Sequence, residues 1–231
     1  MEISLALSLS KTGLNRDSAF NFSCSRCLAC CRFKKIQLNP YEIARMADNR
    51  GISTSEFIAR YTTTGGTVLR SNQDGSCVFL NIEGCSVHSD RPLVCRLYPL
   101  GRQVDSLGVE IFSQIEFEET CKGVLHENGT IEQYLAEQGA APFMRAADLY
   151  LDLLWRLLDL LNEQELEPSQ SETILETVEA VAADNAGEYD LSWIDMDWAV
   201  AEYCRLSGIS VPKGIDEKMG IHIKAVREWA A

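Results

Sequence analysis

The sequence predicts an α+β protein in two parts, a small irregular cysteine-rich domain over residues 1–125 and an all-α helical bundle region over residues 126–231. The distribution of cysteine supports this division, since eight of the nine cysteines lie between Cys24 and Cys121 and only Cys204 lies outside. Charge supports it as well, because residues 1–125 carry 14 basic and 13 acidic side chains, whereas residues 126–231 carry 7 and 21. Apolar residues at helical spacing dominate only the second part.

The overall composition argues against two classes of partner. A formal net charge of −13 disfavours a protein that binds nucleic acid by neutralising phosphates. The longest apolar-rich stretch, Leu149 to Leu161, is interrupted by three charged side chains and is shorter than the roughly 20 apolar residues of a membrane span. The first residues, MEISLALSLSK, lack the basic start and the small-residue cleavage site of a secretory signal. We therefore expect a cytoplasmic protein with neither nucleic acid nor membrane as a partner.

The spacing of the eight cysteines predicts metal ligation. Two residues between cysteines allow a tight turn to direct both sulfurs at one ion, and thiolates suit zinc or iron–sulfur clusters. A disulfide scaffold is disfavoured because the cytosol keeps thiols reduced, and a role as packed core residues suits Cys204 but not the polar segment Cys24–Cys31. The predicted ligands are Cys24, Cys27, Cys30, Cys31, Cys77, Cys85, Cys95 and Cys121. The first domain is thus expected to be pinned by metal.

The start of this pattern, C-x2-C-x2-C, resembles the bacterial ferredoxin run but departs from it at Cys31, which follows Cys30 directly. Side chains of adjacent residues tend to diverge, so we expect these two cysteines to serve different metals or different atoms of one cluster. Four thiolates leave a formal charge of −2 on a zinc ion or on an oxidised [4Fe–4S] core, which favours nearby cations. We expect Arg91 and Arg96 to tune or steady the centre, with Arg96 donating to sulfur or to a carboxylate.

Three segments carry a resemblance to a known family. The run Cys24–Cys31, the segment GSCVFLNIEGCSVHSDRPLVCRLYPLG over Gly75–Gly101 and the tripeptide Cys121–Gly123 resemble the YkgJ-type cysteine-cluster proteins. This group is also called the CxxCxxCC family, or the zinc- or iron-chelating domain, and the resemblance covers roughly residues 20–125. Its members are widespread in bacteria, are often labelled Fe–S oxidoreductases and include a relative within flagellin lysine N-methylases. The resemblance implies metal binding more firmly than it implies a reaction.

Two positions depart from the family pattern. Ala29 stands where many members have Gly, and His88 stands where an aromatic residue is common. The spacing Cys85-x2-His88 leaves open that His88 is a zinc ligand, and the alternative is a packed or solvent-facing substitute for the aromatic residue.

These observations leave three functions open. The first, which we prefer, is an Fe–S protein, with a [4Fe–4S] cluster ahead of zinc, in electron transfer or a redox-linked accessory role with a redox or other protein partner. The second is a zinc-stabilised interaction module without catalysis, since structural zinc contributes roughly 10–16 kcal/mol to the folding of small peptides. The third is a protein-modifying enzyme such as a lysine N-methylase relative, although no cofactor-binding segment is visible.

Local signals also predict individual elements. Asn39-Pro40 is expected to start a helix through YEIARMA, and Ser53-Thr54-Ser55-Glu56 reads as a capping box before EFIARY. The predicted strand-like pieces are Val68–Arg70, Val78–Leu80 and Leu107–Phe112. The predicted helices of the second part begin near Thr130 and then cover Phe143–Gln164, Glu172–Ala186, Tyr189–Leu206 and Ile215–Trp229.

Two further groups of polar residues occur in the second part. Asp190, Asp195 and Asp197 are read as a solvated face between buried Trp193 and Trp198 rather than as a cation site. The isolated histidines His126 and His222 are expected to be structural or exposed.

Overall fold

The computed structural model describes residues 9–63, 65–105, 107–118, 120–163 and 193–229. The chain forms two compact units, each made of two stretches of sequence. Unit 1 contains residues 1–34 and 71–142, and unit 2 contains residues 35–70 and 143–231. The predicted division after residue 125 stays a prediction, because compact units are not independently folding domains.

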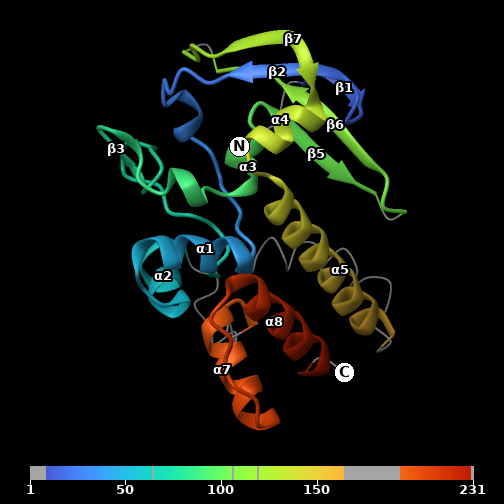
Figure 1. Cartoon of the computed structure of the whole chain (residues 1–231). Coiled ribbons are helices and arrows are strands. Elements are labelled where there is room, and N and C mark those ends of the chain that lie inside the picture. The colour runs from blue at the N-terminus through green and yellow to red at the C-terminus, as the bar shows by residue number, and fades with distance from the viewer. Residues whose placement is uncertain (1–8, 64, 106, 119, 164–192, 230–231) are drawn as a thin grey trace. The chain divides into compact units, whose positions relative to one another are not determined.

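Unit 1 consists of short antiparallel sheets with small helices between them (Figure 1). Its three-stranded sheet has the order β1-β6-β5, and β2 pairs with β7 and β3 with β4. The strands are β1 (Leu9–Leu14), β2 (Ala19–Ser23), β3 (Leu80–Asn81), β4 (Gly84–Cys85), β5 (Leu100–Val104), β6 (Glu110–Ile115) and β7 (Val124–Thr130). The helices are η1 (Ala29–Cys31), η2 (His88–Asp90), α3 (Leu93–Leu97) and α4 (Ile131–Glu137). Together with the helices of unit 2, these sheets confirm the α+β prediction.

An ion-pair network joins the three-stranded sheet to α4. The guanidinium of Arg16 lies 2.6 Å from a carboxylate oxygen of Glu110 on β6 and 2.6 Å from one of Glu132 on α4. Arg102 on β5 donates to the same Glu110 at 2.5 Å. Beneath this network, Phe20 packs edge-on against Tyr134 with ring centroids 5.0 Å apart. Unit 1 is therefore held by aromatic packing as well as by charge.

Unit 2 is helical. Its helices are α1 (Pro40–Arg50), α2 (Thr54–Tyr61), α5 (Ala141–Glu163, which belongs to this unit from Phe143 on), α7 (Met196–Ser207) and α8 (Ile215–Trp229). The α1 helix begins with the predicted capping box, in which Asn39 accepts from the N–H of Glu42 and Glu42 accepts from the N–H of Asn39. At α2, Ser53 accepts from the N–H of Glu56, but the carboxylate of Glu56 pairs with Arg60 instead of returning to Ser53.

The N-termini of α2 and α7 meet around two carboxylates. Asp195 caps α7 and accepts from the hydroxyls of Thr54 and Ser55. Asp197 accepts from the N–H of Thr54 at 3.0 Å and from Lys218 at 2.7 Å. Burial alone would raise the pKa of Asp197, but these hydrogen bonds outweigh it and lower the pKa.

This arrangement changes the interpretation of the acidic segment. Asp195 and Asp197 form part of the helix contact rather than a solvated face, and Asp190 lies outside the described residues. Trp193 and Trp198 are 39% and 46% exposed, so the prediction that they are buried is wrong.

Several predicted boundaries also differ from the structure. Val68–Arg70 contributes isolated bridges instead of a strand. Only Leu80 of the second predicted piece lies in a strand, because a turn closes between Cys77 and Leu80. The last begins at Glu110, because the Asp105 carboxylate accepts from two N–H groups of the preceding hairpin turn.

Among the helices of the second part, α7 begins at Met196 rather than Tyr189, because Asp195 caps it. The predicted helix over Glu172–Ala186 lies outside the described residues. Within the described part of the chain, no helix combines the length and the apolar character that crossing a bilayer requires.

We predict that Thr54→Val destabilises unit 2. The substitution keeps the shape of the side chain but removes a hydroxyl that donates to Asp195 and accepts from the N–H of Asp197 at 2.9 Å. The expected loss is about 1–3 kcal/mol in the free energy of unfolding, measured in urea by tryptophan fluorescence, since all four tryptophans belong to unit 2. As a control, Ser207→Ala at the exposed end of α7 is expected to change it by less than about 0.5 kcal/mol.

We also predict a pH dependence from His222, which is fully buried. Its ring nitrogens lie 2.9 Å from the Tyr150 hydroxyl and 2.7 Å from the Trp193 carbonyl oxygen. Burial lowers its pKa to about 4, only partly offset by the Trp193 carbonyl and the Asp195 charge. Below pH 6.5 the unfolded chain binds a proton that the folded chain refuses, so stability falls as the pH drops from 6.5 toward 4.

The lost stability amounts to about 3 kcal/mol, because the pKa falls from 6.5 to about 4 on folding and each tenfold change in proton affinity corresponds to about 1.4 kcal/mol. Urea unfolding at several pH values measures this slope, and His222→Gln is expected to flatten it. A variant that keeps the wild-type slope would contradict the assignment to His222.

Candidate metal centre

All eight predicted ligand cysteines belong to unit 1. They are Cys24 and Cys27 in the loop after β2, Cys30 and Cys31 in η1, Cys77 before β3, Cys85 in β4, Cys95 in α3 and Cys121 before β7. All nine cysteines of the chain are free thiols, which does not support the disulfide alternative. Cys204 is 1% exposed in α7, as expected for a packed core residue.

Backbone hydrogen bonds join the first cysteine block to the second. The N–H of Cys77 donates to the carbonyl of Cys31 at 2.8 Å, and the N–H of Phe33 donates to the carbonyl of Gly75 at 2.8 Å. Gly75 has a φ of +76°, and a Cβ there would lie 2.2 Å from the ring of Phe33. Glycine is therefore required where the two blocks come together.

The first block curls so that backbone N–H groups face sulfur. Arg26 and Leu28, on either side of Cys27, adopt the left-handed conformation with φ of 53° and 66°, which costs a non-glycine residue roughly 1–2 kcal/mol. The N–H of Arg26 donates to the sulfur of Cys24 at 3.4 Å. Such strained residues cluster at functional sites, where the backbone is shaped around a ligand.

One pair of thiols links the first block to the segment before β7. Cys27 and Cys121 share a side-chain hydrogen bond. The N–H of Lys122 donates to the sulfur of Cys27 at 3.4 Å and is the largest influence lowering its pKa. The N–H of Gly123 donates to the sulfur of Cys121 at 3.5 Å, but burial and the Cys27 charge raise the pKa of Cys121. The sequence separates these two cysteines widely, and folding makes them neighbours.

A second pair is formed by Cys30 and Cys31, whose thiols also share a hydrogen bond. This bond lowers the pKa of Cys30 to about 7, aided by the charges of Lys34 and Arg91, and raises that of Cys31. The prediction that these adjacent side chains diverge is therefore wrong for this structure. Both cysteines lie in the short 3-10 helix η1.

The remaining thiols influence the ionisation of these pairs through their charges. Burial raises the pKa of Cys77 and of Cys85. At each sulfur a backbone N–H group donates a hydrogen bond that partly offsets this rise. The charges of Cys95 and Cys85 raise the pKa of Cys31, so these side chains act on one another directly. Such mutual repulsion has to be relieved by a cation when the thiols ionise together.

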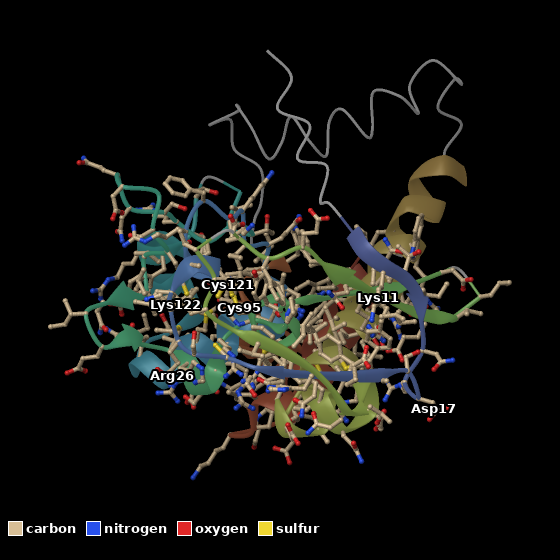
Figure 2. All side chains as sticks on the ribbon, turned by 90° about the horizontal axis from the view of Figure 1, so that it is seen from above. Lys11, Asp17, Arg26, Cys95, Cys121 and Lys122 are labelled. Atoms are coloured by element: carbon tan, nitrogen blue, oxygen red, sulfur yellow. The ribbon has the colours of Figure 1, made fainter. Side chains whose placement is uncertain are left out.

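The donor set fits a thiophilic metal, since it combines thiols, N–H groups directed at sulfur and nearby cations. Figure 2 shows Cys95 and Cys121 in one region of the view together with Arg26 and Lys122, away from Lys11 and Asp17. Among the described residues, no three His, Cys, Asp or Glu side chains already stand in a metal-holding arrangement.

The two predicted arginines occupy different positions. Arg91 donates to the carbonyl of His88 at 2.6 Å and to Gln138 at 2.8 Å, and its charge lowers the pKa of Cys30 and of Cys85. Arg96 is buried, and its guanidinium donates to the carbonyls of Arg91 at 3.0 Å, of Gln138 at 2.8 Å and of Ser89. Arg91 therefore acts on the thiols through its charge, whereas these bonds of Arg96 hold the backbone around α3.

His88 lies beside this arginine group. Burial, followed by the charges of Arg91, Arg26 and Arg96, lowers its pKa and favours the neutral ring. Its Nδ1 lies 3.4 Å from the guanidinium of Arg91. A neutral imidazole is the form that ligates zinc.

Sequence reasoning missed Tyr98, which follows Cys95 in the Arg-x-Tyr-Pro segment. Its hydroxyl is buried and has no hydrogen-bond partner among the described residues. Burial raises its pKa to about 12, with the charges of Cys121 and Cys30 contributing. Tyr134 donates to the carbonyl of Tyr98 at 2.8 Å. The signal in the sequence that could have pointed to Tyr98 is its place directly before Pro99, three residues after Cys95.

Comparison with known proteins agrees with this picture. Residues 23–122 match the model of the CxxCxxCC family, described as "Putative zinc- or iron-chelating domain". The resemblance predicted from the sequence is thereby confirmed over this segment, which contains all eight candidate ligands.

Relatives outside the family model add little about function. An uncharacterized protein of the archaeon Methanocaldococcus jannaschii is 26% identical over 115 residues. The alignment covers 48% of this chain and 62% of that relative's length. No solved structure matches the chain significantly.

We predict that Arg96→Lys destabilises unit 1 although it keeps the charge. Lysine cannot reach three separate carbonyls with the geometry of the guanidinium, so buried acceptors lose their partners. The expected loss is about 2 kcal/mol or more, measured by amide hydrogen exchange in unit 1. Arg60→Lys, on the exposed surface of α2, serves as the control and is expected to leave exchange unchanged. Unaltered exchange in Arg96→Lys would show that only the charge of Arg96 matters.

Proposed function

We propose that this chain, whose residues 23–122 form a CxxCxxCC domain, binds metal through the cysteines of unit 1. The observation that carries the proposal is that eight cysteines from separate stretches of sequence lie in one compact unit without disulfides, and that two pairs of their thiols are in hydrogen-bond contact. Backbone N–H groups and the charges of Lys34 and Arg91 favour the thiolate form that a metal requires. The proposed ligands are all eight of these cysteines.

An iron–sulfur cluster is the metal centre that we prefer. Cys24 and Cys95 are exposed at the surface of unit 1. Exposure of the ligands suits a centre that exchanges electrons with another molecule. When bound, such a cluster supplies reversible one-electron chemistry. The proposed role is therefore electron transfer, or an accessory function linked to it.

The same exposed edge suits a redox partner protein. Arg26 and Lys122 are exposed beside cysteines of the candidate centre. Exposed cations next to a redox centre steer the approach of an acidic partner. The density of free thiols also suits a reducing compartment, which supports a cytoplasmic location.

A zinc-stabilised interaction module is the second candidate, and a specific feature of unit 2 favours it. Trp198 and Trp229 form an edge-to-face pair with centroids 5.9 Å apart, and they are 46% and 42% exposed. Exposed aromatic residues are enriched where proteins bind one another. In this alternative the metal only folds unit 1.

Metal analysis of protein purified anaerobically distinguishes the two. We expect a brown product containing iron and acid-labile sulfide, with visible absorption that bleaches on reduction. A colourless product with zinc would support the interaction module, and a product that takes up neither metal under reducing conditions would contradict both.

The ligand assignment is tested by matched alanine variants. Cys27→Ala and Cys95→Ala are each expected to weaken metal affinity by at least about tenfold, because each removes a proposed ligand. The metal content of the purified variants is expected to fall accordingly. Cys204→Ala removes a buried thiol of unit 2 and is expected to leave metal content unchanged. Far-ultraviolet circular dichroism, which reports on the backbone of both units, verifies that each variant is otherwise folded. Equal metal loss in Cys204→Ala and Cys27→Ala would overturn the assignment.

A further inference from the structure

Among the described residues, the hydroxyl of Tyr98 is a buried polar group in the cysteine-rich unit that the fold leaves without a hydrogen-bond partner. It is buried, and within the described part of the chain no atom completes a hydrogen bond with it. A buried hydroxyl without a partner costs about 1–3 kcal/mol. Buried polar groups of this kind are typical of sites that are completed by a ligand or an ion.

The tyrosine ring itself is well held. It packs edge-on against Phe22 of β2 with centroids 6.2 Å apart and lies 6.5 Å from Phe117. The Tyr134 hydroxyl donates to the Tyr98 carbonyl at 2.8 Å, which ties its backbone to α4. The hydroxyl is therefore directed by packing, since the contacts of the ring and backbone leave it little freedom.

Groups from three segments act on the hydroxyl. Cys121, in the loop before β7, and Cys30, in η1, act on it through their charges. The backbone N–H of Glu118 is directed at the same oxygen and lowers the pKa of Tyr98. An N–H group is a donor, so it cannot accept the hydrogen of the hydroxyl. What the hydroxyl lacks is an acceptor for its hydrogen, and ionised sulfur is an acceptor.

We infer that Tyr98 donates a hydrogen bond to the sulfur of Cys121 when that sulfur is bound to metal, so that metal loading satisfies the buried hydroxyl. The inference rests on the proposed function and adds a residue that holds a ligand rather than the metal. In the metal-free chain the Cys121 sulfur is a thiol engaged with Cys27. Ligation converts it to a thiolate, which is the stronger acceptor.

The consequence is a larger stabilisation of the loaded chain than of the metal-free chain. Groups that hydrogen-bond to metal ligands typically change metal affinity by about 10–100-fold when they are removed. For an iron–sulfur cluster, a hydrogen bond to sulfur also stabilises the more negative reduced form, so its loss lowers the reduction potential.

The test compares Tyr98→Phe with the wild-type chain and with Tyr203→Phe, which removes a hydroxyl bound to Glu228 in unit 2. The probe is Co²⁺ under anaerobic conditions, read by its sulfur-to-cobalt charge-transfer bands in competition with a chelator. Tyr98→Phe is expected to bind Co²⁺ about tenfold more weakly with shifted bands. Its metal-free form is expected to be at least as stable as wild type in urea, monitored by circular dichroism. Tyr203→Phe is expected to match wild type in cobalt affinity.

Two results would overturn the inference. Unchanged Co²⁺ affinity and bands in Tyr98→Phe would mean that the hydroxyl does not reach a metal-bound sulfur. A loss of stability in the metal-free form that accounts for the whole loss of affinity would make the hydroxyl structural. Failure of the wild-type chain to bind Co²⁺ or iron would instead refute the proposed function, so the two failures are distinguishable.

Discussion

The candidate centre depends on the backbone pairing that holds Cys31 against Cys77 and Phe33 against Gly75. These bonds bring together two cysteine blocks that are more than forty residues apart in the sequence. They also explain why glycine is needed at position 75, where a side chain would collide with the Phe33 ring. Without this pairing, the thiols of η1 and those near β3 and β4 would belong to separate loops.

Electrostatics decides what such a gathering of thiols can do. Several thiolates at close range repel one another. This repulsion adds to the hydrogen bond from Cys30 and to burial in raising the pKa of Cys31, and to burial in raising that of Cys121. N–H groups from Arg26, Lys122 and Gly123 relieve part of this cost at three sulfurs. A bound cation relieves the rest, because it makes the ionised form of every ligand favourable at once.

The two arginines near Cys95, Arg91 and Arg96, have different roles although they are close in sequence. Arg91 remains near the thiols and influences their ionisation. Arg96 is buried, and its bonds to the carbonyls of Ser89, Arg91 and Gln138 fix the backbone next to α3, the helix that carries Cys95. A planar guanidinium suits this task, because its donors diverge in a fixed geometry. Positioning and charge are thus divided between two side chains five residues apart.

Local chemistry in the sequence determined much of this protein. The capping residues Asn39 and Thr130 set helix starts, helical periodicity set α5 and α8, and the cysteine spacing indicated a thiol-rich site. These features depend on residues within a few positions of one another. Only the tertiary structure decided that each unit is built from two stretches of sequence and that Cys27 meets Cys121. It also decided that Asp195 and Asp197 join α2 to α7 and that the hydroxyl of Tyr98 is buried without a partner among the described residues. Each of these depends on packing between distant segments, for which spacing along the chain carries no information.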